Sequence, residues 1–390
     1  MLTVLSLARK SLARLGLAAA AAVGLTACVP TTSANGPGLT PGAPVQVALL
    51  VPSGSGQGSD DYVARSLENA ARLAIADLGG VQIDLRVYPT GGQPSQAAAA
   101  ATQAVADGAK IILGPVFAEE ANAAGVAVAA SGVNVLSFSN NTAIAGGNVF
   151  VLGPTFQNTA NRLARYSVTQ GKRRIMPVYD RTAAGEIGRV AIETAVSSSG
   201  GTVVAPNGYE FSQNGIVAAV PSIAAAARGN ADAMFLTADT AGALPLLTQL
   251  LRENGLDPAS MQFIGLTRWD IPPATLALPG VQGGWFAMPD PALYQQYQAR
   301  YSAAYGEAPP PVSGLAYDGI AAVGALVRQG STNPLSAARL TQGSGFAGVG
   351  GIFRLLPNGT NERGLAVAQI RNSQVVVIDP APRSFGGAGF

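Results

Sequence analysis

The chain has 390 residues, of which 48% are apolar and 12% are charged, and its formal net charge is +2. It contains no His and one Cys, which excludes His-based catalytic triads, His-ligated metal sites and intramolecular disulfides. The length predicts two or three domains, and the near-neutral charge argues against a nucleic-acid-binding protein.

The N-terminus has the pattern of a secretory leader. Arg9, Lys10 and Arg14 precede an apolar stretch at 15–25, which is shorter than the roughly 20 residues of a membrane-spanning helix. The following Leu-Thr-Ala-Cys sequence resembles a bacterial lipobox and ends at the single Cys, Cys28; an incidental Cys after an ordinary leader is the alternative. We expect a signal peptide at 1–27, lipidation of Cys28 and a flexible tether over 28–44.

The leader also accounts for the positive net charge of the chain, and the residue after the Cys indicates which membrane is expected to hold the protein. Removing residues 1–27 removes three basic side chains and no acidic one, so the formal net charge falls from +2 to −1. Val29 follows the Cys, where Asp would retain a lipoprotein in the inner membrane of some bacteria. The sequence therefore predicts a periplasmic lipoprotein, held by the outer membrane rather than the inner one.

From residue 45 onward, short apolar runs alternate with Ala-rich stretches, which predicts repeated β-α units. Strands are expected at 45–51, 81–87, 110–113, 133–137 and 149–152, and helices at 60–78, 94–107 and 118–130. Such units form a parallel sheet with helices on both faces.

The alternation restarts after Gly153-Pro154 and predicts a second α/β unit of comparable size. Its helices are expected near 156–170, 185–198, 213–228 and 242–253, and its strands near 174–179, 202–205, 233–237, 262–265 and 284–287. Helices near 291–305 and 313–329 follow. The end of the chain predicts a meander of strands near 351–355, 364–370 and 374–378, with turns at Asn358-Gly359 and Asn372-Ser373.

Several segments have a recognisable pattern: 47–52, 112–115, 150–155, 294–309, 316–319 (Ala-Tyr-Asp-Gly), 348–353 and Asn358-Gly359. Their order over residues 45–390 resembles that of the type I periplasmic binding proteins, the Leu/Ile/Val-binding-protein family. The resemblance implies a two-lobed α/β fold, in which each lobe is a mainly parallel sheet flanked by helices and crossover strands join the lobes. We expect lobe one at 45–150 plus 289–330, and lobe two at 151–288 plus 331–390.

Ligands of open α/β sheets bind beyond the carboxyl ends of the strands, so the loops after the expected strands supply the candidate cleft residues. They are Ser53, Phe117, Ser137, Ser139, Asn140, Asn141, Tyr179, Asp180, Asp239, Thr267 and Arg268. Each has the alternative of being an ordinary turn residue. We expect no catalytic residue, no metal and no cofactor.

The pattern of the family's amino-acid importers is incomplete here. Importers usually place a Ser after the third strand and a Thr after the fourth, where this chain has Phe117 and Ser139-Asn140-Asn141. Thr267 and Arg268 occupy the usual place of the acid that binds the ligand's ammonium. Asp239 is either a substitute for that acid or the N-cap of the helix at 242–253.

Other segments point to a second branch of the family: Leu136-Ser137-Phe138-Ser139-Asn140, then Arg162, Tyr166 and Gly171 after the crossover, and 353–354, 358–359 and 363–366. In these segments the chain is more similar to the penicillin-binding protein activators. The resemblance implies a lipid-anchored protein that contacts a peptidoglycan synthase across the periplasm. The best-known activators carry an extra N-terminal helical domain, and here the short segment 29–44 precedes the α/β part.

Three functions follow as hypotheses. The favoured one is a non-catalytic activator-like regulator of peptidoglycan synthesis whose partner is a synthase. The alternative is the solute-binding lipoprotein of an ABC importer, with an amino-acid-like or peptide ligand and a permease as partner. Catalysis is set aside because the paired acids Glu119-Glu120 and Asp60-Asp61 lie at expected helix starts, where acids stabilise the helix dipole and act as caps.

Overall fold

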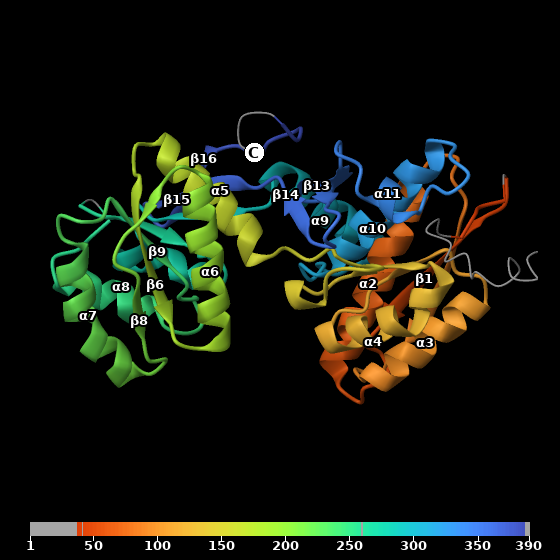
Figure 1. Cartoon of the computed structure of the whole chain (residues 1–390), viewed down its shortest axis with the longest axis horizontal. Helices are drawn as coiled ribbons and strands as arrows, with labels where there is room; N and C mark the ends of the chain where they lie inside the picture. The colour runs from red at the N-terminus through yellow and green to blue at the C-terminus, as the bar shows by residue number, and fades with distance from the viewer. Residues whose placement is uncertain (1–36, 41, 259, 387–390) are drawn as a thin grey trace, which may run out of the picture. The chain divides into compact units, whose positions relative to one another are not determined.

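The computed structural model describes residues 37–40, 42–258 and 260–386. The expected signal peptide, the expected lipidation site at Cys28 and residues 29–36 and 41 of the expected tether lie outside this part. Where the tether is described, the backbone N–H of Leu39 donates to the carbonyl of Thr332 at 3.3 Å. The described chain forms two α/β lobes, so the expected fold class is confirmed (Figure 1).

The first lobe is built on a parallel sheet with the strand order β2-β1-β3-β4-β5. Alternate residues of β1 enter different cores: Val47 and Leu49 pack with α2 and α10, whereas Ala48 and Leu50 pack with α3 and α4. Both faces are therefore buried, as the continuous apolar run of β1 predicts. The elements are β1 (Val45–Val51), α2 (Gly58–Asp77), β2 (Ile83–Pro89), α3 (Pro94–Ala106), β3 (Ile111–Leu113), α4 (Ala118–Val128), η1 (Ala129–Ser131), β4 (Asn134–Ser137), η2 (Thr142–Ile144), β5 (Val149–Val151) and α10 (Ser313–Arg328).

The second lobe has a mixed sheet with the order β16-β15-β11-β10-β9-β6-β7, and β8 also pairs with β6. β15 and β16 run antiparallel to their neighbours, and the other pairs are parallel. Met176 and Val178 of β6 pack with α7 and α8, whereas Ile175 packs with α5 and α6. The elements are α5 (Phe156–Thr169), β6 (Arg174–Asp180), α6 (Ala183–Ser198), β7 (Thr202–Val203), β8 (Asn207–Tyr209), α7 (Gln213–Ala227), β9 (Ala233–Leu236), α8 (Leu244–Glu253), β10 (Gln262–Gly265), η3 (Pro273–Ala277), η4 (Pro279–Val281), β11 (Trp285–Met288), β15 (Ala366–Arg371) and β16 (Gln374–Asp379).

The C-terminal part is divided between the lobes differently from the expected boundary at residue 331. Leu335, Leu340, Phe346, Phe353 and Leu355 belong to the main core of the first lobe. The elements of this part are α9 (Pro291–Tyr305), α11 (Ala337–Leu340), β12 (Phe346–Gly348), β13 (Gly351–Leu355) and β14 (Asn361–Arg363). β12, β13 and β14 form a separate three-stranded antiparallel sheet.

The expected C-terminal meander is two hairpins in two different sheets. β13 pairs with β14 across the Asn358-Gly359 turn, where Gly359 has a φ of 81°. β15 pairs with β16 across Asn372 and Ser373, whose φ angles are 51° and 61°. Turn residues fix each hairpin locally, but they carry no information on which sheet the hairpin joins.

The first crossover segment, at 151–153, receives hydrogen bonds from side chains of β14. The amide nitrogen of Asn361 donates to the carbonyls of Val151 and Gly153, at 2.8 Å each. Arg363 donates through Nη2 to the carbonyl of the residue between them, Leu152. Three consecutive carbonyls at the end of β5 and just beyond it are thereby satisfied by side chains.

We expect Asn361→Ala to lower the free energy of unfolding by at least about 2 kcal/mol, because it leaves two buried carbonyls without a donor. Urea unfolding of the chain without its leader measures the change. Asn230→Ala is the control, since Asn230 is exposed and its side chain donates to one helix carbonyl, that of Ala226. Equal effects of the two substitutions would show that Asn361 is not a structural clamp.

One carboxylate of the first lobe is buried and poorly hydrogen-bonded. Glu120, in the first turn of α4, is 1% exposed, and neither of its oxygens has a hydrogen-bond partner of normal geometry among the described residues. The neighbouring Thr90 hydroxyl donates to the carbonyl of Val51 at 3.1 Å. Burial raises the pKa of Glu120, because the charged form loses its hydration, and the nearby Thr90 side chain and Phe117 backbone oppose that rise.

The raised pKa gives Glu120→Gln a pH-dependent effect. The folded state holds this proton more tightly than the unfolded state, so wild-type stability falls as the pH rises from the unfolded pKa through the folded one. We expect the Gln variant to be more stable than wild type at about pH 8, with the difference shrinking towards about pH 4. Thermal melts across this range measure it. The control is Glu119→Gln, which changes an exposed neighbour, and an advantage of Glu120→Gln that does not vary with pH would contradict the argument.

Among the described residues, no helix combines the length and the apolar character needed to cross a bilayer.

Candidate functional site

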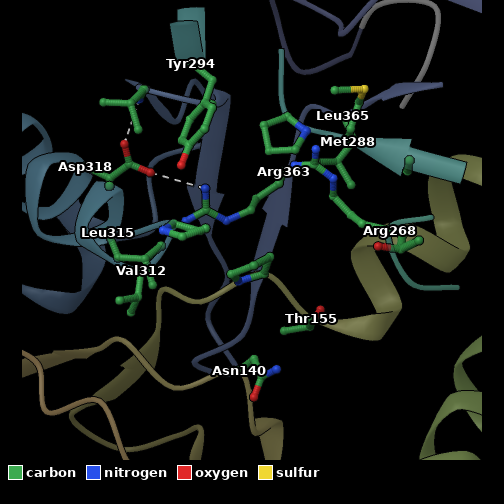
Figure 2. A pocket seen from close by; sticks show the side chains of 18 of the residues that line it. Asn140, Thr155, Arg268, Met288, Tyr294, Val312, Leu315, Asp318, Arg363 and Leu365 are labelled. Atoms are coloured by element: carbon green, nitrogen blue, oxygen red, sulfur yellow. Dashed lines mark hydrogen bonds and ion pairs between the residues drawn. The ribbon is translucent and has the colours of Figure 1, made fainter. Parts of the chain in front are cut away.

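A cavity of about 860 Å³ is lined by residues of both lobes. Loops after β3, β4, β10 and β11 contribute to it, together with the N-terminal part of α5, α9, α10 and the β13–β14 sheet. Its wall is mostly apolar; Figure 2 shows some of the lining side chains, including Met288, Leu315 and Leu365. The volume lies in the range of small-molecule sites, about 300–1,000 Å³.

A buried ion pair forms one wall of the cavity. Arg363 donates through Nη1 to Asp318 Oδ2 at 3.2 Å, and the backbone N–H of Val349 donates to Asp318 Oδ1 at 2.8 Å. The side chain of Asp318 is 2% exposed and that of Arg363 is 10% exposed. Burial raises the pKa of Asp318, and the charge of Arg363 opposes that rise. The guanidinium also lies over the ring of Phe353, 5.2 Å from its centroid.

A second ion pair lies on the side of the cavity formed by the loop after β10. Arg268 donates through Nε to Asp270 Oδ1 at 2.8 Å, and its Nη2 pairs with Asp270 Oδ2. Among the described residues that line the cavity, these two Arg and two Asp are the charged ones, so the pocket wall is formally neutral. In the described chain, no cluster of three or more His, Cys, Asp or Glu could hold a metal ion.

Three polar atoms of the lining residues are buried and have no hydrogen-bond partner among the described residues: Tyr294 Oη, Thr267 Oγ1 and Arg363 Nε. Figure 2 shows the Tyr294 hydroxyl pointing towards the Asp318–Arg363 pair. Burial raises the pKa of Tyr294, and the charge of Arg268 opposes that rise, so the hydroxyl stays protonated at neutral pH. Each of the three atoms therefore has a donor capacity that no described residue uses.

Four of the residues predicted from the sequence line this cavity. Ser139 and Asn140 follow β4, and Thr267 and Arg268 follow β10. The carboxyl ends of these strands supply them, as the rule for open α/β sheets predicts.

The other predicted residues of the first lobe have roles in the turns. The Ser137 hydroxyl donates to the carbonyl of Pro115 at 3.3 Å, and the Asn141 side chain accepts from the N–H of Ala143. Ser53 accepts through its carbonyl from the N–H of Gly91. Phe117 is the N-cap residue of α4 and is 43% exposed.

The remaining predicted residues of the second lobe also lie outside the cavity lining. Asp180 is buried and accepts from the Thr182 hydroxyl and, at 3.0 Å, from the Thr237 hydroxyl. The ring of Tyr179 lies under the guanidinium of Arg189 at 5.4 Å. Asp239 is exposed, and its backbone carbonyl, not its side chain, accepts from Leu244 at the start of α8.

Sequence reasoning missed Asp318, Arg363 and Tyr294 as site residues. Tyr294 and Asp318 lie in segments that carry the family resemblance, and Arg363 lies in one that carries the activator resemblance, but none of the three follows directly after a strand of the two large sheets. The available signal was Asp318, an acid in an otherwise apolar segment of a chain with few charges.

Comparisons with known proteins agree with this architecture. The periplasmic binding protein family model matches residues 44–374. No curated protein sequence gives a significant match.

Solved structures provide similar folds. A branched-chain amino acid ABC transporter periplasmic ligand-binding protein from Burkholderia xenovorans has 19% identity and a TM-score of 0.68, and covers 88% of this chain and 97% of its own. A substrate-binding protein from Desulfitobacterium hafniense, in complex with Leu, has 18% identity and a TM-score of 0.62, with coverage of 86% and 100%. A solute-binding protein from Rhodopseudomonas palustris, in complex with 3,4-dihydroxybenzoic acid, has 17% identity and a TM-score of 0.59, with coverage of 88% and 99%.

At these identities the solved structures establish the fold and leave the ligand open. The family match spans most of the chain, and the two described lobes have the sheets and crossovers of the type I fold. The chain therefore belongs to the periplasmic binding protein family.

Proposed function

We propose that this protein is the solute receptor of an ABC importer and binds a small organic ligand in the cavity lined by both lobes. The observation that carries the proposal is the cavity of about 860 Å³, with its apolar wall and its buried polar atoms that lack partners. Such a combination of apolar surface and a few convergent polar groups is typical of ligand sites. The similar structures with Leu and with 3,4-dihydroxybenzoic acid support a small organic ligand.

We infer that the protein has no catalytic activity. Each carboxylate that lines the cavity already accepts hydrogen bonds from an Arg, so neither Asp270 nor Asp318 is placed as a free general base. The Thr and Ser hydroxyls of the lining have no His to activate them, because the chain contains none. The side chains that line the cavity are therefore better suited to binding and releasing an unchanged ligand than to covalent chemistry.

The activator-like function is the second candidate. Part of the sequence pattern that supports it has a structural explanation: Arg162 is buried, donates to the carbonyl of Leu365 at 2.6 Å and pairs with Asp379 at 2.7 Å. Arg162 thus holds α5 against the C-terminal strands. If the cavity binds no ligand, regulation of a peptidoglycan synthase is the hypothesis to test. The test is whether the protein captures a synthase in a pull-down.

We expect a ligand screen by thermal shift to give at least one hit among amino acids, short carboxylates and small peptides, tested on residues 29–390. A ligand at about 100 times its Kd adds about 2.7 kcal/mol, which raises the Tm of a chain of this size by at least about two degrees.

A matched pair of variants locates the binding. Val312→Trp places a large ring at the cavity wall and should abolish the shift, whereas Val126→Trp, at a site 72% exposed on α4, should leave it unchanged. A hit that survives Val312→Trp would place the ligand elsewhere, and silence across the panel would reject the receptor function.

We also propose that Cys28 anchors the protein by lipid on the periplasmic side of a bacterial membrane, with the outer membrane favoured by Val29. We expect radiolabelled palmitate to be incorporated into the protein and Cys28→Ser to abolish incorporation. The variant should then leave the membrane fraction on cell fractionation. Unchanged labelling of Cys28→Ser would exclude this anchor.

A further inference from the structure

The buried polar atoms of the cavity wall that lack a hydrogen-bond partner among the described residues can all donate a hydrogen bond. Arg363 Nε can only donate, and the hydroxyls of Tyr294 and Thr267 are protonated groups that can donate. The two carboxylates of the wall are already in use, because Asp318 accepts from Arg363 and Val349, and Asp270 accepts twice from Arg268. A ligand therefore meets free donors and finds no free carboxylate among the described lining residues.

Tyr294 differs from the other tyrosines of α9 in this respect. The Tyr297 hydroxyl bonds to Ser313 at 2.6 Å, Tyr301 accepts from the Asn69 side chain at 3.3 Å, and Tyr305 donates to the Asn69 carbonyl at 2.8 Å. The Tyr294 ring packs 6.0 Å from that of Tyr297, yet its buried hydroxyl has no protein partner among the described residues. The Tyr294 ring is therefore packed against its neighbour, while its hydroxyl keeps an unused hydrogen-bonding capacity beside the pocket.

We propose that the ligand is an organic carboxylate with an apolar body and no ammonium group, and that its carboxylate accepts hydrogen bonds from Arg363 Nε and Tyr294 Oη. This inference rests on the proposed receptor function and names its substrate class. Charge-assisted bonds from a guanidinium to a carboxylate are about twice as strong as neutral ones. Figure 2 shows that the Tyr294 hydroxyl and the Arg363 guanidinium lie at the same end of the pocket.

The rest of the wall fits the apolar body of such a ligand. Phe138, Leu266, Met288, Leu315 and Ile352 line the cavity from both lobes. Their surfaces gain from covering an alkyl or aromatic group. An α-ammonium group in the same place would lose its hydration against apolar side chains and two carboxylates that are already paired, which disfavours an amino acid.

The test is a set of matched ligands titrated by calorimetry into residues 29–390. 4-Methylpentanoate, leucine and 3-methylbutylamine share one branched alkyl group and carry the carboxylate, both groups and the amine, respectively. Benzoate and benzylamine repeat the comparison with a ring. We expect at least one of the two carboxylates to bind at least tenfold more tightly than leucine, and both amines to show no binding.

Variants then assign the carboxylate contact. Tyr294→Phe removes one hydroxyl and should weaken carboxylate binding about ten- to a hundredfold, the equivalent of one hydrogen bond to a charged group. Tyr305→Phe is the control on the same helix, since its hydroxyl bonds to Asn69 outside the cavity lining, and it should leave the affinity unchanged. Circular dichroism melts of both variants check that the fold is retained.

The contrary results distinguish failure of this inference from failure of the proposed function. Tighter binding of leucine than of 4-methylpentanoate, or an unchanged carboxylate affinity in Tyr294→Phe, overturns the ligand class and leaves the receptor function intact. Failure of both carboxylates while an amino acid or a peptide of the wider screen binds does the same. Silence of the whole screen rejects the receptor function and the inference together.

Discussion

The structure depends on how the buried carbonyls of the first crossover find donors. Residues 151–153 run from the last residue of β5, the edge strand of the first sheet, into the crossover. Asn361 and Arg363, two residues apart on β14, satisfy these carbonyls from one side. β14 in turn is held by Asn158, whose side chain donates to the Asn361 carbonyl at 2.8 Å. The site therefore forms where the chain passes between the lobes.

The charge of Arg363 determines much of the chemistry around it. A guanidinium that is 10% exposed needs a counter-charge, and Asp318 on α10 provides it. The pair leaves the guanidinium Nε without a hydrogen-bond partner among the described residues. A residue required to complete the backbone of the crossover thus also presents a donor to the pocket, so structural and binding roles share one side chain.

The sequence predicts the parts of this structure that depend on local pattern. The run at 45–51 is a strand buried on both faces, and the boundaries of most helices agree within two or three residues. The turns at Asn358-Gly359 and Asn372-Ser373 are also found where the residues indicate them. Pattern fails where partners are distant: Gly364 and Leu365 carry the chain from one sheet to another, and no periodicity marks that change.

The same distinction between local pattern and distant partners applies to the residues of the site. Ser139, Asn140, Thr267 and Arg268 were predictable because a general rule places ligands at strand ends. Asp318 and Arg363 are 45 residues apart, and their pairing follows from tertiary packing alone. Nothing in the local sequence of Tyr294 distinguishes it from Tyr297 or Tyr301 on the same helix; the difference is the absence of a neighbour such as Ser313.

The unpartnered atoms also connect ligand binding with stability. A buried donor without a partner destabilises the folded state by about 1–3 kcal/mol, and the cavity wall has three such atoms among the described residues. A ligand that supplies acceptors to two of them removes that cost in the bound state and covers apolar wall at the same time. Binding and stabilisation then arise from the same contacts, at the junction that also holds the crossover carbonyls. A pocket arranged in this way selects ligands whose acceptors match the hydrogen-bond donors that the fold leaves without partners.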